Sequence, residues 1–119
     1  MSSRKFPKSS RLKKKIVIQE LFNKGSSFYS FPIKFTFLPA PPEITDHQVL
    51  ISVSKRNFKK AVSRNKIKRL IREAYRNLQD NMLVFPVVLS LHYTAKEINP
   101  YSTIFHAMQK GIEALKSKY

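Results

Sequence analysis

Residues 61–78, AVSRNKIKRLIREAYRNL, decide how the rest of this sequence is interpreted. An α-helix turns about 100° per residue, and at that spacing one arc of the segment is apolar. Within about 60° of Ile67 lie Leu70, Ile71, Ala74 and Leu78. The opposite arc carries Arg64, Asn65, Lys66, Lys68, Arg69, Arg72 and Arg76. We therefore predict a helix that packs one face on a core and presents cations on the other.

The cationic arc differs from an ordinary solvated helix face, which is the alternative interpretation. Such a face interleaves acids and bases at i,i+4, whereas Glu73 is the only acid in this segment. Neighbouring like charges destabilise an isolated helix, so a partner has to compensate them. Arginine offers a fork of donors, and asparagine offers both a donor and an acceptor. This arc is thus typical of a surface that binds nucleic-acid phosphates and base edges.

The whole chain has 119 residues, with 23 Lys and Arg against 7 Asp and Glu, a formal net charge of +16. The excess is concentrated, because residues 1–15 carry seven cations and no acid, and residues 55–76 carry ten cations and one acid. Two cationic segments indicate a polyanionic partner. The absence of cysteine excludes disulfides and thiolate sites, and no apolar run reaches the length of about 20 that spans a bilayer. We expect a small, soluble, intracellular protein.

The remaining elements follow from periodicity and turn residues. We expect helices over 13–24, with Gly25 just after the end, and from Pro100 onward, and strands over 31–38, 48–54 and 83–92. The first twelve or so residues lack periodicity and are predicted to form a flexible basic arm. The order of the elements indicates an α+β or α/β sandwich, a small mixed sheet with three helices, as a single domain over 1–119.

The segment SKRNFKKAVSRNKIKRLIREAYR, residues 54–76, closely resembles the signature of the bacterial ribonuclease P protein subunit. The matching positions are Ser52, Val53, Ser54 and Lys55, followed by Ala61, Val62, Arg64, Asn65, Lys68, Arg69, Arg72 and Glu73. The stretch RLKKKIVIQELFNKG at 11–25 is similar to the first helix of that family. Two positions depart from the family pattern: Ile18 replaces a common aromatic, and the turn over 57–60 lacks the usual glycine.

The resemblance implies an α/β sandwich with an unusual left-handed crossover through the basic helix. It also implies a cytoplasmic protein that binds a catalytic RNA and precursor tRNA, with Mg2+ held mainly by the RNA, and no membrane or protein partner. The residues implied to bind the catalytic RNA are Arg64, Asn65, Lys66, Lys68, Arg69 and Arg72. A cleft for the single-stranded 5′ leader is implied to include Phe22, Phe35 and Lys55. Burial in the core is the alternative for both phenylalanines.

No catalytic group is expected on this chain. Its three histidines, His47, His92 and His106, are far apart in sequence, and its carboxylates are scattered. No pair of them suggests acid–base catalysis or a two-metal site, and two glycines cannot form a glycine-rich phosphate loop. The resemblance therefore predicts a ribonuclease P subunit that assists removal of the tRNA 5′ leader while the RNA carries the catalytic centre.

Two other functions remain open from the residues alone. A ribosomal protein or RNA chaperone would use the same basic helix without belonging to an enzyme. A DNA-binding regulator is a third possibility, although a strand follows residues 61–78 where a helix-turn-helix protein has paired short helices.

Overall fold

A computed structural model describes residues 11–82 and 85–119, so most of the expected basic arm lies outside the described residues. The helices are α1 (Lys15–Lys24), α2 (Ala61–Leu78) and α3 (Tyr101–Ser117), with a short 3-10 turn η2 (Gln79–Asn81) after α2. The strands are β1 (Ser26–Ser30), β2 (Ile33–Pro39), β3 (Gln48–Val53) and β4 (Val87–Tyr93). Within the described ranges, no helix combines the length and apolarity needed to cross a membrane.

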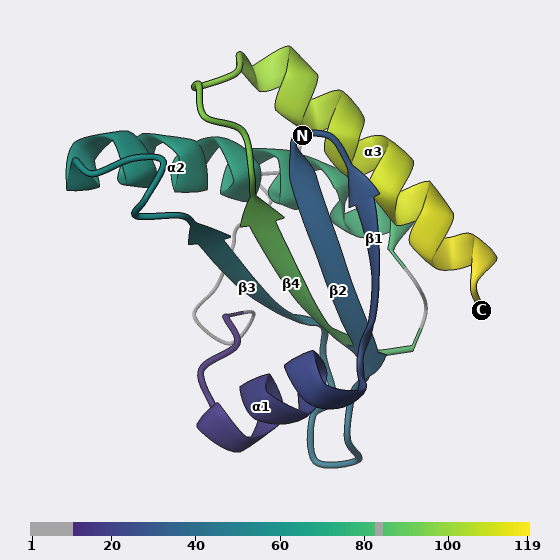
Figure 1. The fold of residues 1–119 in the computed structure, drawn as a ribbon. Coiled ribbons are helices and arrows are strands. Elements are labelled where there is room, and N and C mark those ends of the chain that lie inside the picture. Colours follow the sequence, from purple (N-terminus) through teal and green to yellow (C-terminus); the bar gives the residue numbers. More distant parts are fainter. Residues whose placement is uncertain (1–10, 83–84) are drawn as a thin grey trace.

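The four strands form one mixed sheet in the order β1-β2-β4-β3. β2 is antiparallel to both β1 and β4, while β3 and β4 are parallel neighbours joined through α2. In Figure 1, α2 passes behind the sheet, both strands point the same way and β4 lies to the right of β3. Seen from the helix side, the connection therefore moves to the left. This left-handed crossover is the one predicted, although nearly all such connections are right-handed.

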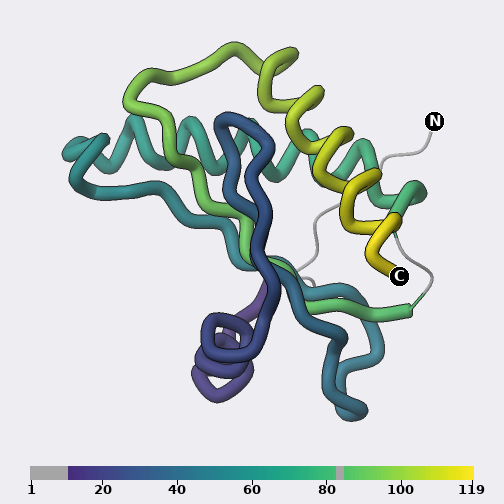
Figure 2. The backbone as a smooth tube through the Cα atoms, turned by 45° about the vertical axis from the view of Figure 1, so that its right-hand side comes forward, coloured from purple at the N-terminus to yellow at the C-terminus, as the bar shows by residue number. Residues whose placement is uncertain are grey.

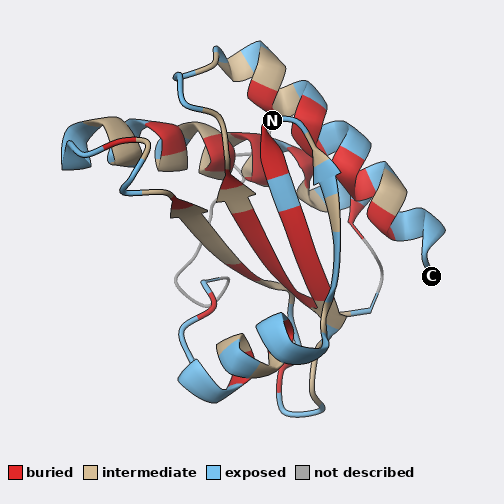
Figure 3. Ribbon diagram, viewed as in Figure 1, coloured by how far each residue is buried: buried red, intermediate tan, exposed pale blue. Residues whose placement is uncertain are grey.

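Helices cover both faces of the sheet, as the α+β sandwich prediction requires. Figure 2 shows α2 and α3 on one side of the strands and α1 on the other. The larger apolar cluster lies between the sheet and the α2–α3 layer, and it includes Ile33, Phe35, Ile67 and Met108. A smaller cluster beneath α1 joins Leu12, Val17, Leu21, Ile44 and Val88. Figure 3 shows how this burial is concentrated in the central strands β2 and β4, while edge strand β1 is mostly exposed or half-buried.

Most predicted boundaries are close to the observed ones, and α2 has the predicted range. Strand β1 was not predicted, because three of its five residues are serine and the run lacks apolar alternation. It pairs with β2 from Ser26↔Phe37 to Ser30↔Ile33. The strand predicted over 31–38 begins only at Ile33, because Phe31 and Pro32 form the turn between β1 and β2.

Helix α1 is held in place by packing rather than by its ends. Its first turn has no acid, and Lys14 gives no side-chain cap. Val17 and Leu21 instead bury its inner face. The helix ends at Gly25, whose N–H donates to the Leu21 carbonyl oxygen over 2.9 Å. A Cβ at Gly25 would lie 2.8 Å from the Phe37 carbonyl oxygen, so glycine allows the chain to turn directly into β1.

Candidate nucleic-acid interface

Helix α2 buries one face, much as its periodicity predicts. Ile67, Ile71, Ala74 and Leu78 are buried, as expected, while Leu70 is only half-buried. Tyr75, which was not included in the apolar arc, is buried too, and this burial raises its pKa to about 12. The buried stripe is therefore wider toward Tyr75 than the helical wheel suggested.

The opposite face of α2 carries the cations. We call Asn65, Lys66, Lys68, Arg69 and Arg72 the cationic face; Asn65, Lys66 and Arg69 are exposed, and Lys68 and Arg72 are half-buried. Arg64 differs from these residues, because its Nη1 donates to the carbonyl oxygens of Phe58, at 2.7 Å, and Lys59, at 3.0 Å. Arg64 thus braces the turn that leads into the helix, a role that the sequence did not reveal.

The N-terminal segment and α2, far apart in sequence, meet at edge strand β3. The Leu12 N–H donates to the Val49 carbonyl oxygen over 3.0 Å, which holds Arg11 and Lys13 beside β3. A hollow, here called the edge hollow, is lined by Arg11, Leu12, Lys13, Val49, Leu50, Ile51, Lys68 and Arg72. Burial, followed by the charges of Arg11 and Arg69, lowers the pKa of Arg72. Arg11 and Lys13 of the first cationic segment therefore share one surface with Lys68 and Arg72 of the second, and no acid lines this hollow.

Helix α1 covers only part of its face of the sheet. Leu38 and Val88, which are partners in one row of the sheet, pack beneath it. The next row is Ser27, Thr36, Ser90 and Leu50, of which Leu50 still packs against the cluster beneath the helix. The row after it is Tyr29, Lys34, His92 and Ser52, and none of these four residues packs against that cluster. A hollow of about 390 Å³, which we call the cleft, is lined by Phe22, Ser27, Lys34, Thr36, Ser52, Ser90 and His92.

The floor of the cleft is polar and ordered by hydrogen bonds. Ser27 Oγ lies 2.9 Å from Thr36 Oγ1, and Ser52 Oγ lies 2.8 Å from His92 Nδ1. Burial, and then the charge of Lys34, lowers the pKa of His92, so its imidazole is neutral near pH 7. Its Nε2 makes no hydrogen bond with the described part of the chain. This floor offers hydroxyl, imidazole and ammonium groups to a ligand.

Only one of the three expected cleft residues lines the cleft. Phe22 projects from α1 with 55% of its surface exposed, as an aromatic available to a ligand would. Phe35 was expected there wrongly: it is fully buried on the opposite face, stacked on Phe28 with ring centroids 4.9 Å apart. Lys55 is exposed in the turn after β3, three residues beyond Ser52, and does not line the cleft.

The side chains that the sequence analysis missed are the polar ones on the strands. Lys34 and Thr36 alternate with the apolar residues of β2, and Ser90 and His92 do the same on β4. The polar members of such an alternation face the solvent, and the apolar members pack inside. The alternation could therefore have located the cleft floor, whereas the search for aromatics led to Phe35.

The described residues offer little for metal binding or acid–base chemistry. Within them, no three His, Asp or Glu side chains are grouped as they would be to hold a metal ion. Two of the carboxylates are in ion pairs on helix surfaces, Glu20 with Lys24 and Glu73 with Arg76.

Comparison with known proteins gives a consistent result. The family model described as Ribonuclease P matches residues 6–116. The ribonuclease P protein component of Porphyromonas gingivalis is 31% identical over 114 residues, which cover 88% of this chain and 82% of that protein. The structure of the RNase P protein of Staphylococcus aureus superposes with a TM-score of 0.74 at 28% identity, covering 90% of this chain and 95% of that one. The RNase P protein of Thermotoga maritima, at 19% identity, has the same fold, with a TM-score of 0.75 and coverage of 87% and 96%.

Proposed function

Since the chain belongs to the ribonuclease P protein family, we propose that it serves as the protein subunit that holds two RNA segments at once. The cationic face of α2 and the edge hollow bind the catalytic RNA. The cleft binds the single-stranded 5′ leader of precursor tRNA. In this way the protein assists the endonucleolytic removal of the leader in the cytoplasm.

The observation that carries this proposal is the position of β3 between the two surfaces. Leu50 and Ile51 line the edge hollow, and Ser52, the next residue, lines the cleft on the face toward α1. Two RNA segments bound on these surfaces would run side by side along one strand. Phosphates in two RNAs repel each other, and the cations around β3 would offset that repulsion.

The chemistry of each surface fits a different kind of RNA. The cationic face supplies charge along a helix, which suits the phosphates of a folded RNA. The cleft combines one exposed aromatic, Phe22, with a floor of hydroxyls and the His92 imidazole. Unpaired bases can stack on such an aromatic and present their edges to such a floor, whereas paired bases cannot.

We assign phosphodiester hydrolysis to the RNA partner, with Mg2+ held mainly by that RNA. The protein contributes affinity and position. The alternatives, a ribosomal or chaperone protein and a DNA-binding regulator, account for the cationic face but give no role to the cleft, and family membership favours the ribonuclease P subunit over both.

Reconstitution tests this proposal. Precursor tRNA is incubated with the catalytic RNA of ribonuclease P, with and without the full chain, at a Mg2+ concentration that limits the RNA alone. We expect the chain to increase cleavage at the 5′ end of the mature tRNA and to leave the cleavage position unchanged. Equal rates with and without the chain, while a ribonuclease P protein of known activity stimulates the same RNA, would contradict the proposal.

A further inference from the structure

Two aromatic side chains next to the cleft are far more exposed than their size would favour. Tyr29, in β1, is 55% exposed, and Phe31, in the turn between β1 and β2, is 59% exposed. Their ring centroids lie 6.2 Å apart in an edge-to-face arrangement. Neither ring belongs to the apolar clusters, so packing of the core does not explain them.

The sheet register places Tyr29 at one end of a row that includes cleft residues. Its register partner is Lys34, whose partner on β4 is His92, whose partner on β3 is Ser52. The neighbouring ring of Phe28 stacks on buried Phe35 on the opposite face, so Tyr29 faces the same side as the cleft floor. Residues two apart on a strand are about 6.6 Å apart, so Tyr29 lies roughly that far along β1 from Ser27 in the cleft lining.

The tyrosine ring is fixed in place across the end of the sheet. Its hydroxyl lies 2.8 Å from Thr94 Oγ1, and the Thr94 hydroxyl also donates to the Pro32 carbonyl oxygen over 3.1 Å. The Thr94 N–H donates to the same carbonyl oxygen over 2.8 Å. A ring held by such bonds loses little conformational freedom when a flat ligand stacks on it.

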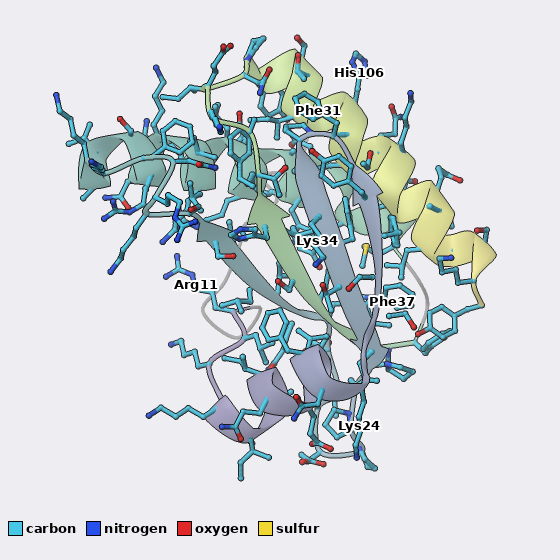
Figure 4. The ribbon with its side chains drawn as sticks, viewed as in Figure 1. Arg11, Lys24, Phe31, Lys34, Phe37 and His106 are labelled. Carbon is cyan, nitrogen blue, oxygen red and sulfur yellow. The ribbon has the colours of Figure 1, made fainter. Side chains whose placement is uncertain are left out.

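Two lysines and one carboxylate line the hollows around the two rings. Tyr29 and Phe31 line a hollow with His106 and Lys110 of α3, and no carboxylate lines that hollow. On its other side Phe31 lines a second hollow with Lys96 and with Glu97, the one acid there. Figure 4 shows Phe31 at the turn and His106 projecting from α3 above it. Exposed aromatics among cations are typical of surfaces that bind unpaired nucleotides.

We propose that Tyr29 and Phe31 form a stacking platform that continues the cleft past β1 and takes unpaired nucleotides of the same RNA strand. This inference rests on the proposed function, because the cleft must hold a single strand for the platform to extend its path. The net charge of +16 favours a polyanion over a second copy of this chain as the occupant. The platform adds leader nucleotides to the contact without using the cationic face of α2.

The test is an equilibrium titration of the full chain with a fluorescent single-stranded RNA of about ten nucleotides, within the length that single-strand grooves cover. Phe31→Leu and Tyr29→Leu remove an aromatic face but keep an apolar side chain, whereas Phe31→Tyr keeps the ring. Phe85→Leu is the matched control, because Phe85 is exposed but packs edge-to-face against Tyr119 away from the row. A strand of equal length without bases measures the contribution of charge alone, and thermal melts verify that each variant folds.

We expect each ring-to-leucine variant at Tyr29 and Phe31 to weaken binding by about fivefold or more, the loss of one stacked base. Phe31→Tyr and Phe85→Leu should bind the RNA as tightly as the wild type does. All variants should bind the strand without bases with the wild-type affinity for that strand. Phe22→Ala, measured in parallel, distinguishes a failure of the platform from a failure of the proposed cleft. If it weakens binding while Phe31→Leu and Tyr29→Leu do not, the platform is wrong and the cleft stands; if none of the three does, both are wrong. A Phe31→Leu variant that converts a dimer of the free protein to a monomer would also overturn the platform.

Discussion

Gly111 of α3 and Phe35 of β2 are in direct contact, and a Cβ atom on Gly111 would overlap the phenylalanine ring. The ring is fully buried, and on its β1 side it stacks on Phe28. Phe35 therefore limits how closely α3 approaches the sheet. Its role is structural, and its ring has no exposed surface that could contact RNA.

This contact predicts that Gly111→Ala destabilises the protein. Alanine favours a helix by about 1 kcal/mol over glycine, but forcing a methyl group into a packed core costs about 1–3 kcal/mol, so we expect a net loss. Urea unfolding of Gly111→Ala, Phe35→Leu and the double variant measures the effect. The double variant should lose less than the sum of the single losses, because the smaller side chain vacates the space. Strictly additive losses would show that the two residues do not interact.

The buried stripe of α2 predicts a large loss of stability when it is truncated. Ile67 and Ile71 are fully buried, so replacing either by Ala should lower the free energy of unfolding by about 2–5 kcal/mol. Val62→Ala, on the same helix but 79% exposed, is the control and should have little effect. Denaturant unfolding compares the three variants, and equal stability for all of them would mean that α2 is oriented differently.

The cations of α2 predict two separable effects. Lys66→Ala with Arg69→Ala should leave the melt unchanged and weaken binding to the catalytic RNA, because both side chains are exposed. The magnitude of the slope of log K against log salt should fall by about 0.7–0.9 for each lost phosphate contact. Lys116→Ala with Lys118→Ala removes the same charge from the end of α3 and should change the slope little.

Arg64 is expected to behave differently from those two residues. Arg64→Ala removes the hydrogen bonds to the Phe58 and Lys59 carbonyl oxygens, so it should also lower stability, by about 1–3 kcal/mol for bonds from a charged donor. Thermal melts of Arg64→Ala beside Arg69→Ala make the comparison. Equal melting temperatures would show that the turn does not depend on Arg64.

The lowered pKa of His92 predicts how the stability of the protein depends on pH. Burial and Lys34 lower this pKa in the folded protein below the value of about 6.5 expected in the unfolded chain. As the pH falls below about 6.5, the unfolded chain therefore takes up a proton at this position before the folded one does, so stability declines. His92→Gln lacks this contribution, and its stability should decline less between about pH 7 and pH 5. If the free energy of unfolding declined equally with pH in the two proteins over that range, the lowered pKa would be contradicted.

Local patterns predicted much of the fold, because they depend on interactions within a few residues. The range of α2, with its buried and cationic faces, follows from helical periodicity and the concentration of like charges. Strand β1 could not be predicted in this way, because a serine-rich edge strand is defined by its pairing with β2.

The cleft was harder to predict from sequence than the cationic face. The cleft lies where α1 stops covering the sheet. The position of that limit depends on where the buried face of α1, which includes Leu21, packs along the strands. Ser52 and His92 are 40 residues apart and meet only because β3 and β4 are parallel neighbours in the sheet, with these two residues in register. No spacing in the sequence reveals such a pair.

The central claim, that the cleft binds the 5′ leader, is tested most directly by Phe22→Ala in the reconstituted complex. Equilibrium titrations with precursor tRNA and with mature tRNA, which has no leader, should show weaker binding of the precursor by about 1–3 kcal/mol and unchanged binding of mature tRNA. Ile16→Ala, on the same helix and 72% exposed but outside the cleft lining, should leave both affinities unchanged. Equal weakening of both tRNAs by Phe22→Ala, or no weakening of either, would contradict the assignment of this cleft to the leader.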